Sequence, residues 1–351
     1  MRLAGRLVSR RRAADSVNSY REAASSVDPA PTGASSMVVT SASTGTLEER
    51  RVGSSGWGTT SVLKAVGLAK RYGKVVALDG VSLEVDRGEM FCIVGPNGAG
   101  KTTFIESALG FRRLDAGSVY WFGEEVRGRP PPHIARRIGT SLERMQLLDN
   151  LTVKENLRLV ASLWGVRLTA ERLREVLEEV DMWSRLDARY GRLSAGQKKR
   201  VDIAAALLTE PEVLIFDEPE ANLDPLARIE IMDLIRRLNR GGITVIYSTH
   251  SMEIASRYST RVAVMNKGKV LAIGDPAELA AKYGGKWRVA VRLRRQPAKG
   301  FAQDGDRYVA EFDTVADALK ALHELGSDIV DVAIEAPTLA KAFESLVRGN
   351  A

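Results

Sequence analysis

The chain has 351 residues, 44% of them hydrophobic and 27% charged, a balance that is typical of globular proteins and excludes a low-complexity or collagen-like chain. Its 51 lysines and arginines against 44 acids give a formal net charge of +7 at pH 7, but the arginines are scattered. The charge therefore does not by itself indicate a nucleic acid or an anionic membrane surface as partner. No stretch approaches the roughly 18 consecutive apolar residues of a membrane-spanning helix.

The first 60 residues differ from the rest of the chain. They begin with MRLAGRLVSRRRAADSVNSYREAASS, which is rich in arginine and serine and poor in acids, and continue in a run rich in Ser, Gly and Thr as far as Thr60. A cleaved targeting peptide has such a composition, and so does a disordered extension or a stretch upstream of a true start at Met37. We interpret residues 1–60 as a disordered or targeting-like extension outside the fold.

The sequence of residues 62–126 predicts several strands, with one helix between them along the chain. Glycine turns separate three predicted short strands, VLKAVGLAK, KVVAL and VSLEVD. EMFCIVG follows as a buried strand, in which we expect the lone Cys92 to be a small buried hydrophobe rather than a reactive thiol. A single cysteine cannot form an internal disulfide, which favours a reducing, cytosolic compartment. KTTFIESALG has helical spacing, and GSVYWFGEEV predicts two strands joined by a turn.

The middle of the chain alternates helices with buried strands. Residues 152–190 are helical and amphipathic, as in ERLREVLEEVDMW. Then come a helix (VDIAAALLTE), a buried strand (EVLIFDEP), a helix (IEIMDLIRRLN), a buried strand (ITVIYSTH) and a hairpin (RVAVMNKGKVLAIG) that turns at Lys267 and Gly268. This alternation predicts an α/β fold with a parallel sheet covered on both faces.

The pattern changes after Gly284 and Gly285. WRVAVRLRR, RYVAEF, VADALKALHEL, DIVDVAIE and TLAKAFESLVRG predict a small ββαβα unit, which we place at residues 286–351. One face of its last helix carries an apolar stripe that we interpret as core: Leu339, Ala342, Phe343, Leu346 and Val347.

GPNGAGKTT at 95–103 matches the phosphate-binding pattern G-x-x-x-x-G-K-[ST], and it follows a strand and opens a helix as that pattern requires. Glycines let backbone N–H groups approach an oxyanion, and the helix start adds partial positive charge. We expect Lys101 to reach the β- and γ-phosphates and the Thr102 hydroxyl to ligate Mg²⁺. The alternative is a glycine-rich turn that matches the pattern by chance, but such a turn would not need to lie between a strand and a helix. The expected nucleotide contacts are Gly95, Pro96, Asn97, Gly98, Ala99, Gly100, Lys101, Thr102 and Thr103.

Two carboxylates end the buried strand VLIFDEP. Ligands of open α/β sheets bind outside the carboxyl ends of the strands, so Asp217 and Glu218 are expected to face the nucleotide. Mg²⁺ prefers carboxylate oxygen, which suits Asp217. Glu218 is positioned to orient or deprotonate the attacking water. Alone, the pair would be read as a capped strand end, but the phosphate loop favours a catalytic role.

LSAGQKKR at 193–200 has no histidine, cysteine or carboxylate, only a serine, two small residues and an amide where a helix begins. Together with the phosphate loop and the acids, it makes the chain resemble the ATP-binding cassette (ABC) ATPases from about residue 62 to about residue 279. The resemblance implies a P-loop NTPase core with a parallel sheet, an antiparallel β subdomain and a helical signature subdomain. We place this ATPase domain at residues 61–283, ahead of the α+β appendage.

The resemblance also implies that two cassettes dimerise head to tail, each signature helix facing the ATP of the other subunit. Ser194, Gly196 and Gln197 would then bind that ATP, while Ala195 replaces the family's commonest glycine and keeps the position small. Asp224, in ANLDP, would touch the opposing subunit.

Three further positions carry over from the family. Tyr72 stands where the family places an aromatic that stacks on adenine, although RYGK also fits an exposed turn. His250, which ends IYSTH, matches the switch histidine that contacts the γ-phosphate. Glu143 stands where the family usually has a glutamine that senses Mg²⁺ and the transport partner. A glutamate can still ligate the metal, whereas Gln146 lies three residues out of register.

The family contains transporter motors and soluble machines. Only about 90 residues separate Lys101 from Ser194, with no sustained heptads, and the chain holds one cassette, so a transporter subunit is favoured over a soluble ATPase acting on nucleic acid or the ribosome. The tail resembles that of drug-, lipid- and polysaccharide-exporter cassettes. The resemblance therefore implies an ATPase that uses ATP and Mg²⁺, pairs with a second cassette and a separate transmembrane permease, and lies on the cytoplasmic face of the membrane. No nucleic acid partner is expected.

Overall fold

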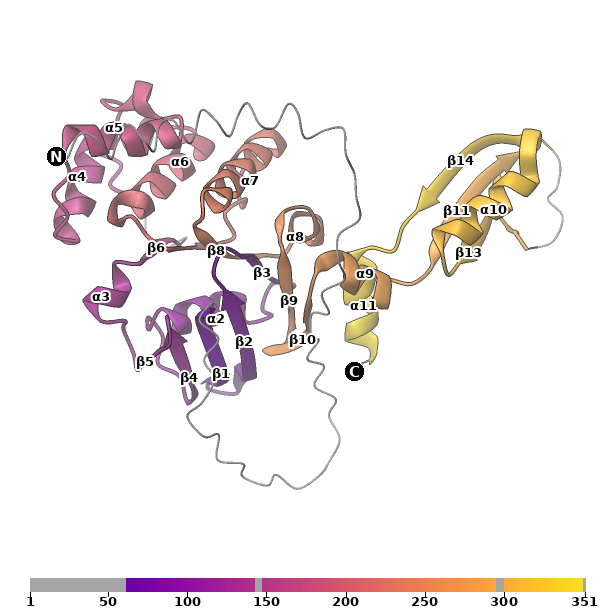
Figure 1. Ribbon diagram of the computed structural model, residues 1–351, viewed down its shortest axis with the longest axis horizontal. Coiled ribbons are helices and arrows are strands. Elements are labelled where there is room, and N and C mark those ends of the chain that lie inside the picture. The colour runs from indigo at the N-terminus through magenta and orange to yellow at the C-terminus, as the bar shows by residue number, and fades with distance from the viewer. Residues whose placement is uncertain (1–60, 143–146, 295–299, 350–351) are drawn as a thin grey trace, which may run out of the picture. The chain divides into compact units, whose positions relative to one another are not determined.

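The computed structural model describes residues 61–142, 147–294 and 300–349 (Figure 1). The interpretation of residues 1–60 and the assignments of Glu143 and Gln146 lie outside these residues. None of the described helices has the length and hydropathy to cross a bilayer.

An antiparallel sheet opens the described chain, with the strand order β2-β1-β4-β5. The predicted turn between β4 and β5 is confirmed. The two strands predicted within residues 74–86 are instead one strand, β2, because Gly80 takes a positive φ of 72° and forms an irregularity within the strand rather than a break. The strands are β1 (Ser61–Tyr72), β2 (Val75–Asp86), β4 (Ala116–Trp121) and β5 (Glu124–Val126).

The central sheet has the order β10-β9-β3-β8-β7-β6. All neighbouring strands are parallel except β9 and β10, which form the predicted hairpin. Because β7 and β8 lie next to each other beside β3, their carboxyl ends open at one edge of the sheet, as predicted. The strands are β3 (Met90–Val94), β6 (Ile138–Ser141), β7 (Val213–Asp217), β8 (Thr244–Thr249), β9 (Arg261–Asn266) and β10 (Lys269–Gly274).

Helices follow most strands of this sheet, and α4 and α5 fall in the region predicted to be helical. Their starts are capped by the hydroxyls of Thr152 and Thr169, the first in a capping box with Glu155. The α-helices are α2 (Lys101–Ala108), α3 (Pro132–Ala135), α4 (Val153–Leu163), α5 (Ala170–Glu179), α6 (Ala195–Ala206), α7 (Pro225–Arg240), α8 (Met252–Tyr258) and α9 (Pro276–Tyr283). Short 3₁₀ turns are η2 (Trp183–Arg185), η3 (Tyr190–Arg192) and η4 (Leu207–Thr209).

The central sheet separates two hydrophobic cores, and β3 contributes alternate side chains to each. Cys92 and Val94 face the core formed with the helices, whereas Phe91 and Ile93 face the core shared with the antiparallel sheet. Cys92 is fully buried, as predicted, and burial raises the pKa of its thiol. The alternation explains why EMFCIVG is apolar throughout.

The C-terminal region contains a second antiparallel sheet, ordered β12-β13-β11-β14, and the helix α10. It matches the predicted ββαβα pattern with one additional short strand, β12. Val289, Val291 and Ala318 form its small core. The final helix, α11, instead buries Leu339 in the helix-side core of the cassette. The elements are β11 (Trp287–Leu293), β12 (Ala302–Asp304), β13 (Arg307–Phe312), α10 (Val315–Leu325), η5 (Gly326–Asp328), β14 (Ile329–Glu335) and α11 (Leu339–Gly349).

Candidate nucleotide-binding and catalytic site

The phosphate loop runs from β3 to α2 and is held against neighbouring backbone. A Cβ at Gly95 would lie 2.1 Å from the carbonyl oxygen of Met265, and a Cβ at Gly100 would lie 2.4 Å from that of Ala77. Gly100 also has a φ of 104°, which disfavours other residues. The N–H of Gly95 donates to the carbonyl of Thr249 at 3.3 Å. Both glycines are therefore required by the close approach of β9 and β2.

Lys101 lies folded over this loop and is only 4% exposed. Its Nζ donates to the carbonyl oxygens of Gly95 at 2.9 Å and Pro96 at 3.1 Å, and it lies 3.3 Å from Oε1 of Glu218. An ammonium group can be buried only when its donors have oxygen partners, and these three oxygens supply them. The helix start beside Lys101 has a glycine as its N-cap, so no side chain caps the first N–H groups of α2.

The two predicted acids lie at the end of β7, where Asp217 is the last residue of the strand and Glu218 follows it. The Ser248 hydroxyl donates to Asp217 and accepts from the N–H of Glu218 at 3.1 Å. Glu218 has a φ of 46°, a strained conformation that is common at functional sites. Its Oε2 lies 3.1 Å from Nδ1 of His250. The Glu218 carboxylate is thus held between a lysine and a histidine.

A cavity of about 510 Å³ opens beside these side chains. Five of the predicted site residues line it: Asn97, Thr102, Asp217, Glu218 and His250. The structure therefore brings the phosphate loop, both acids and the histidine to one place. Six residues outside the predicted site also line the cavity: Lys199, Glu220, Ala221, Asn222, Arg228 and Ser251.

Glu220 is a third acid that the sequence analysis missed. It is 2% exposed and accepts a hydrogen bond from the hydroxyl of Thr249 through Oε1. Its Oε2 is buried without a hydrogen-bond partner among the described residues. Burial raises the pKa of this carboxyl group. The only signal in the sequence is a second glutamate two residues after Glu218.

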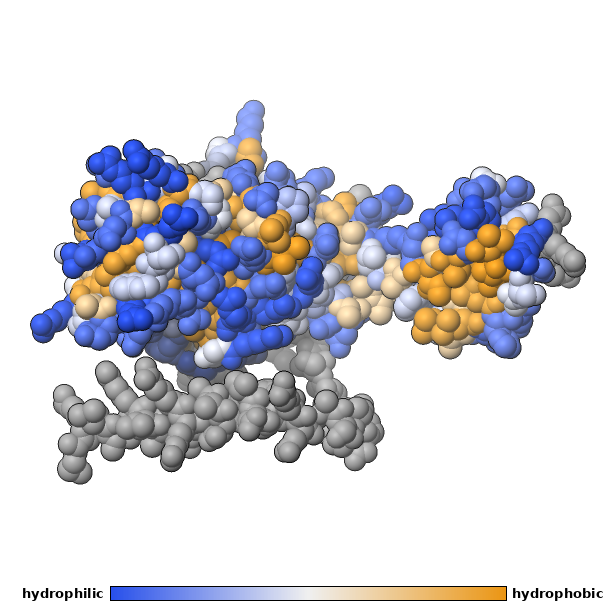
Figure 2. All heavy atoms as spheres, turned by 90° about the horizontal axis from the view of Figure 1, so that it is seen from above, coloured by the Kyte–Doolittle hydropathy of each residue, from blue (hydrophilic) through white to orange (hydrophobic). Residues whose placement is uncertain are grey.

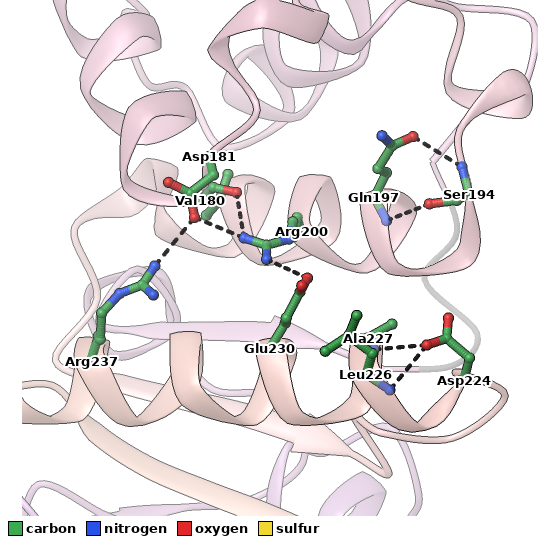
Figure 3. Close-up of polar contacts among 10 residues, drawn as sticks. All are labelled: Val180, Asp181, Ser194, Gln197, Arg200, Asp224, Leu226, Ala227, Glu230 and Arg237. Carbon is green, nitrogen blue, oxygen red and sulfur yellow. Dashed lines mark hydrogen bonds and ion pairs between the residues drawn. The ribbon is translucent and has the colours of Figure 1, made fainter.

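The predicted signature residues lie at two neighbouring helix starts (Figure 3). Ser194 and Gln197 form a capping box at α6: the Ser194 hydroxyl accepts from the Gln197 N–H at 3.3 Å, and the Gln197 amide oxygen accepts from the Ser194 N–H at 3.1 Å. Asp224 caps α7 by accepting from the N–H groups of Leu226 at 3.1 Å and Ala227 at 2.9 Å. Ser194 is exposed at its helix start.

Gly196 lies where these two helices approach each other, and a Cβ there would make a tight contact of 3.3 Å with the Cβ of Ala227. Farther along, Arg200 of α6 contacts Glu230 of α7 at 3.0 Å and Asp181 at 2.9 Å (Figure 3). Arg237 of α7 reaches the same Asp181 carboxylate at 3.5 Å. Charged hydrogen bonds therefore join the signature helix to the helix that follows Asp224.

Other predicted residues stand apart from the cavity. Ser194, Gly196, Gln197 and Asp224 do not line it. Tyr72 ends β1 with 42% of its surface exposed, and the Lys70 Nζ lies 5.5 Å from its ring centre. Its role in adenine stacking stays a prediction, as does the role of Glu143.

Fold and site together define a P-loop ATPase with an antiparallel β subdomain and a helical signature subdomain. A model of the ABC transporter family matches residues 78–221. Daunorubicin resistance ATP-binding protein DrrA3 of Streptomyces coeruleorubidus is 36% identical over 295 residues, which cover 79% of this chain and 93% of that protein. The chain belongs to the ABC transporter family, as an ATP-binding subunit with ATPase activity that powers transport.

Other relatives and solved structures agree with this assignment. Linearmycin resistance ATP-binding protein LnrL of Bacillus subtilis (strain 168) is 35% identical over 64% of this chain and 72% of its own length. An ATP-binding cassette of an ABC transporter solved in its ADP conformation has a TM-score of 0.58 at 30% identity, covering 63% of this chain and 93% of that chain. A bacterial ABC transporter cassette solved as a dimer has a TM-score of 0.55 at 27% identity, covering 61% and 98%. The predicted exporter branch is confirmed, and the soluble alternative finds no support among these relatives.

Proposed function

We propose that the cavity binds the phosphates of ATP together with Mg²⁺. The N–H groups of α2 and the ammonium of Lys101 supply positive charge for the β- and γ-phosphates. The hydroxyl of Thr102 and the carboxylate of Asp217 both line the cavity, and such oxygen donors suit Mg²⁺. When bound, the metal ion neutralises charge on the transferred phosphate. The remaining loop residues from Gly95 to Thr103 hold the nucleotide, Tyr72 stacks on adenine, and Glu143 completes the metal site.

Glu218 orients the attacking water in this proposal, and His250 keeps the carboxylate in place and contacts the γ-phosphate. The observation that carries it is the position of Glu218 between two cationic or hydrogen-bonding partners, Lys101 at 3.3 Å and His250 at 3.1 Å. Phosphate entering beside Lys101 would compete for its ammonium and free Oε1 of Glu218 to accept a proton from water. General-base assistance of this kind contributes about a hundred- to ten-thousandfold in rate.

The signature residues complete the site of a second cassette, arranged head to tail. Ser194, Gly196, Gln197 and Asp224 lie away from the cavity of their own chain, at exposed helix starts that suit phosphate. Two cassettes therefore close only when ATP is bound between them, and hydrolysis of that ATP releases the two cassettes.

The cassette serves an exporter and couples to a separate transmembrane permease on the cytoplasmic face of the membrane. The relatives named for daunorubicin and linearmycin resistance support export rather than import. Residues 61–283 form the ATPase domain in this proposal, and residues 286–351 form the accessory region.

The test is Glu218→Gln, with Glu253→Gln as a control that removes an exposed carboxylate from α8. The first variant should bind ATP with unchanged affinity and lose at least a hundredfold in turnover, because the general base is missing. The control should hydrolyse ATP normally. Undiminished hydrolysis by Glu218→Gln would remove Glu218 from the catalytic role.

A further inference from the structure

The C-terminal sheet exposes a row of apolar side chains. Val330, Val332 and Ile334 of β14 are 51%, 44% and 41% exposed, and they share one face because alternate residues of a strand point the same way. On α10, Leu319 is 52% exposed. Figure 2 shows apolar side chains gathered on the unit that contains these elements. A contiguous exposed apolar patch marks an interaction site.

The strand register explains why this row is open. Val332 pairs with Val291 of β11, and Ile334 pairs with Val289, so all four side chains lie on one face of the sheet. Val289 and Val291 are fully buried with Ala318 of α10. The helix α10 contacts β11 and β13. It therefore covers the middle of the sheet and leaves the β14 side uncovered.

The strand β14 is also an edge of the sheet. It is the last strand in the order β12-β13-β11-β14, and β11 is its only strand partner within the described chain. Its second edge presents backbone N–H and C=O groups that a further strand can pair with. Proteins usually protect such an edge with charge, proline or a covering element. The seven-residue strand β14 has no proline, and five of its residues are apolar.

The charges of β14 are compensated within its own unit. Arg307 contacts Asp331 at 2.7 Å, and Arg288 contacts Glu335 at 3.8 Å. An antiparallel pair of two β14 strands centred on Val332 would place Val330 opposite Ile334 and Asp331 opposite Ala333. Glu335 would then lie opposite Ile329. On the face that carries Val330, Val332 and Ile334, apolar side chains meet apolar ones, and no carboxylate lies directly opposite another.

We infer that β14 pairs with β14 of a second copy of this chain, joining two C-terminal sheets into one antiparallel sheet across a two-fold axis. Such an interface is isologous, so each copy uses the same strand. It contains none of the nucleotide-binding residues and forms without ATP. The inference does not depend on the catalytic assignments, and its failure would leave them unchanged.

Cysteine cross-linking tests the register. Opposite residues of antiparallel strands have Cα atoms about 4.5–5.5 Å apart, a distance that a disulfide spans. Val332→Cys in the full chain should therefore form a covalent dimer under mild oxidation without nucleotide. The native Cys92 is fully buried and gives little background. Leu163→Cys, at an apolar side chain that is 78% exposed, is the control and should remain monomeric on denaturing gels.

Mixing Val330→Cys with Ile334→Cys should give a heterodimeric cross-link that neither variant gives alone. Sedimentation of the unmodified chain without nucleotide should show a dimer, and Val332→Lys should weaken it at least tenfold while Leu163→Lys has no effect. A monomeric unmodified chain, or equal cross-linking by Val332→Cys and Leu163→Cys, would overturn the inference. The inference would also be overturned if the cysteine of Val332→Cys were shielded from modification only in the presence of the permease, because a partner other than a second copy would then cover the strand.

Discussion

The hydroxyl of Thr249 donates a hydrogen bond to the buried carboxylate of Glu220, and this bond joins the loop after Glu218 to the strand end before His250. Thr249 also accepts from the N–H of Ser251 at 2.9 Å through its hydroxyl. The backbone carbonyl of Thr249 also accepts from the N–H of Gly95, so three segments of the site meet at this one residue.

Thr249→Val should lower kcat for ATP hydrolysis about tenfold with little change in KM. The substitution keeps the shape but removes the donor, and a buried acceptor left without its partner costs about 1–3 kcal/mol. The loop and the strand end would then lose their fixed separation, and with it the contact between Glu218 and His250. Steady-state kinetics with Thr249→Ser as the control, which keeps the hydroxyl, checks this. Equal rates for the valine and serine variants would contradict it.

Lys101→Ala should abolish ATP binding at concentrations that saturate the unmodified protein. The ammonium is the buried cation of the phosphate loop, and its removal leaves the loop carbonyls and Glu218 without their positive partner. Titration with a fluorescent ATP analogue measures the affinity. Lys269→Ala removes a lysine that is 63% exposed and should bind normally. Retained affinity in Lys101→Ala would show that the loop does not hold the phosphates.

Ser194→Arg should spare ATP binding by the single chain and prevent ATP-driven closure of two cassettes. The bulky cation would occupy the helix start that faces the second nucleotide. Loss of the N-cap costs about 1 kcal/mol by itself, so Ser194→Ala is the control. Sedimentation should be done with Glu218→Gln, to prevent turnover, and Val332→Lys, to remove association through β14. ATP-dependent dimers of the arginine variant would refute the cross-subunit role.

Asp202 should make the free energy of unfolding depend on pH. Burial raises the pKa of this carboxyl group in the folded protein, and the Tyr190 hydroxyl donates to it at 2.7 Å. A raised folded pKa means that the stabilising contribution is complete below the ordinary pKa of aspartate, near 4, and is lost as the pH rises through the folded value.

Asp202→Asn should therefore gain stability relative to the unmodified protein as the pH rises from 4 to 7. Each unit of pKa elevation corresponds to about 1.4 kcal/mol. Urea unfolding at several pH values measures the difference, with Asp187→Asn, at an exposed carboxylate, as the control. A difference that is constant with pH would exclude burial of the charge as its cause.

The sequence predicted the parts of the site that local chain direction determines. Asp217 ends the buried strand β7 and Glu218 follows it, while Lys101 is separated from the buried strand β3 only by the phosphate loop. Recognition of the two strands therefore places all three residues at one edge of the sheet. The packing of α6 beside α7 depends instead on contacts between distant segments. For this reason, Lys199 and Arg228 could not be assigned to the cavity from the sequence.

Two features of the fold were also beyond sequence reasoning. Glycine is typical of turns, so the sequence predicted a break between two strands at Gly80. The strand residues on both sides of Gly80 nevertheless pair with β1. The apolar stripe of α11 indicated burial without identifying the surface that covers it. That surface belongs to the cassette, where Leu339 and Ala342 are buried.

The chain leaves the cassette at Gly284 and comes back at Thr338, and the two points touch: a Cβ at Gly284 would lie 2.7 Å from the carbonyl oxygen of Thr338. The sheet between them is in effect an insertion with adjacent ends. A truncation before α11 would strip the cassette of a covering helix, whereas splicing a short bridge from one point to the other would excise the sheet alone. The same geometry lets one inserted module be exchanged for another while the cassette stays intact.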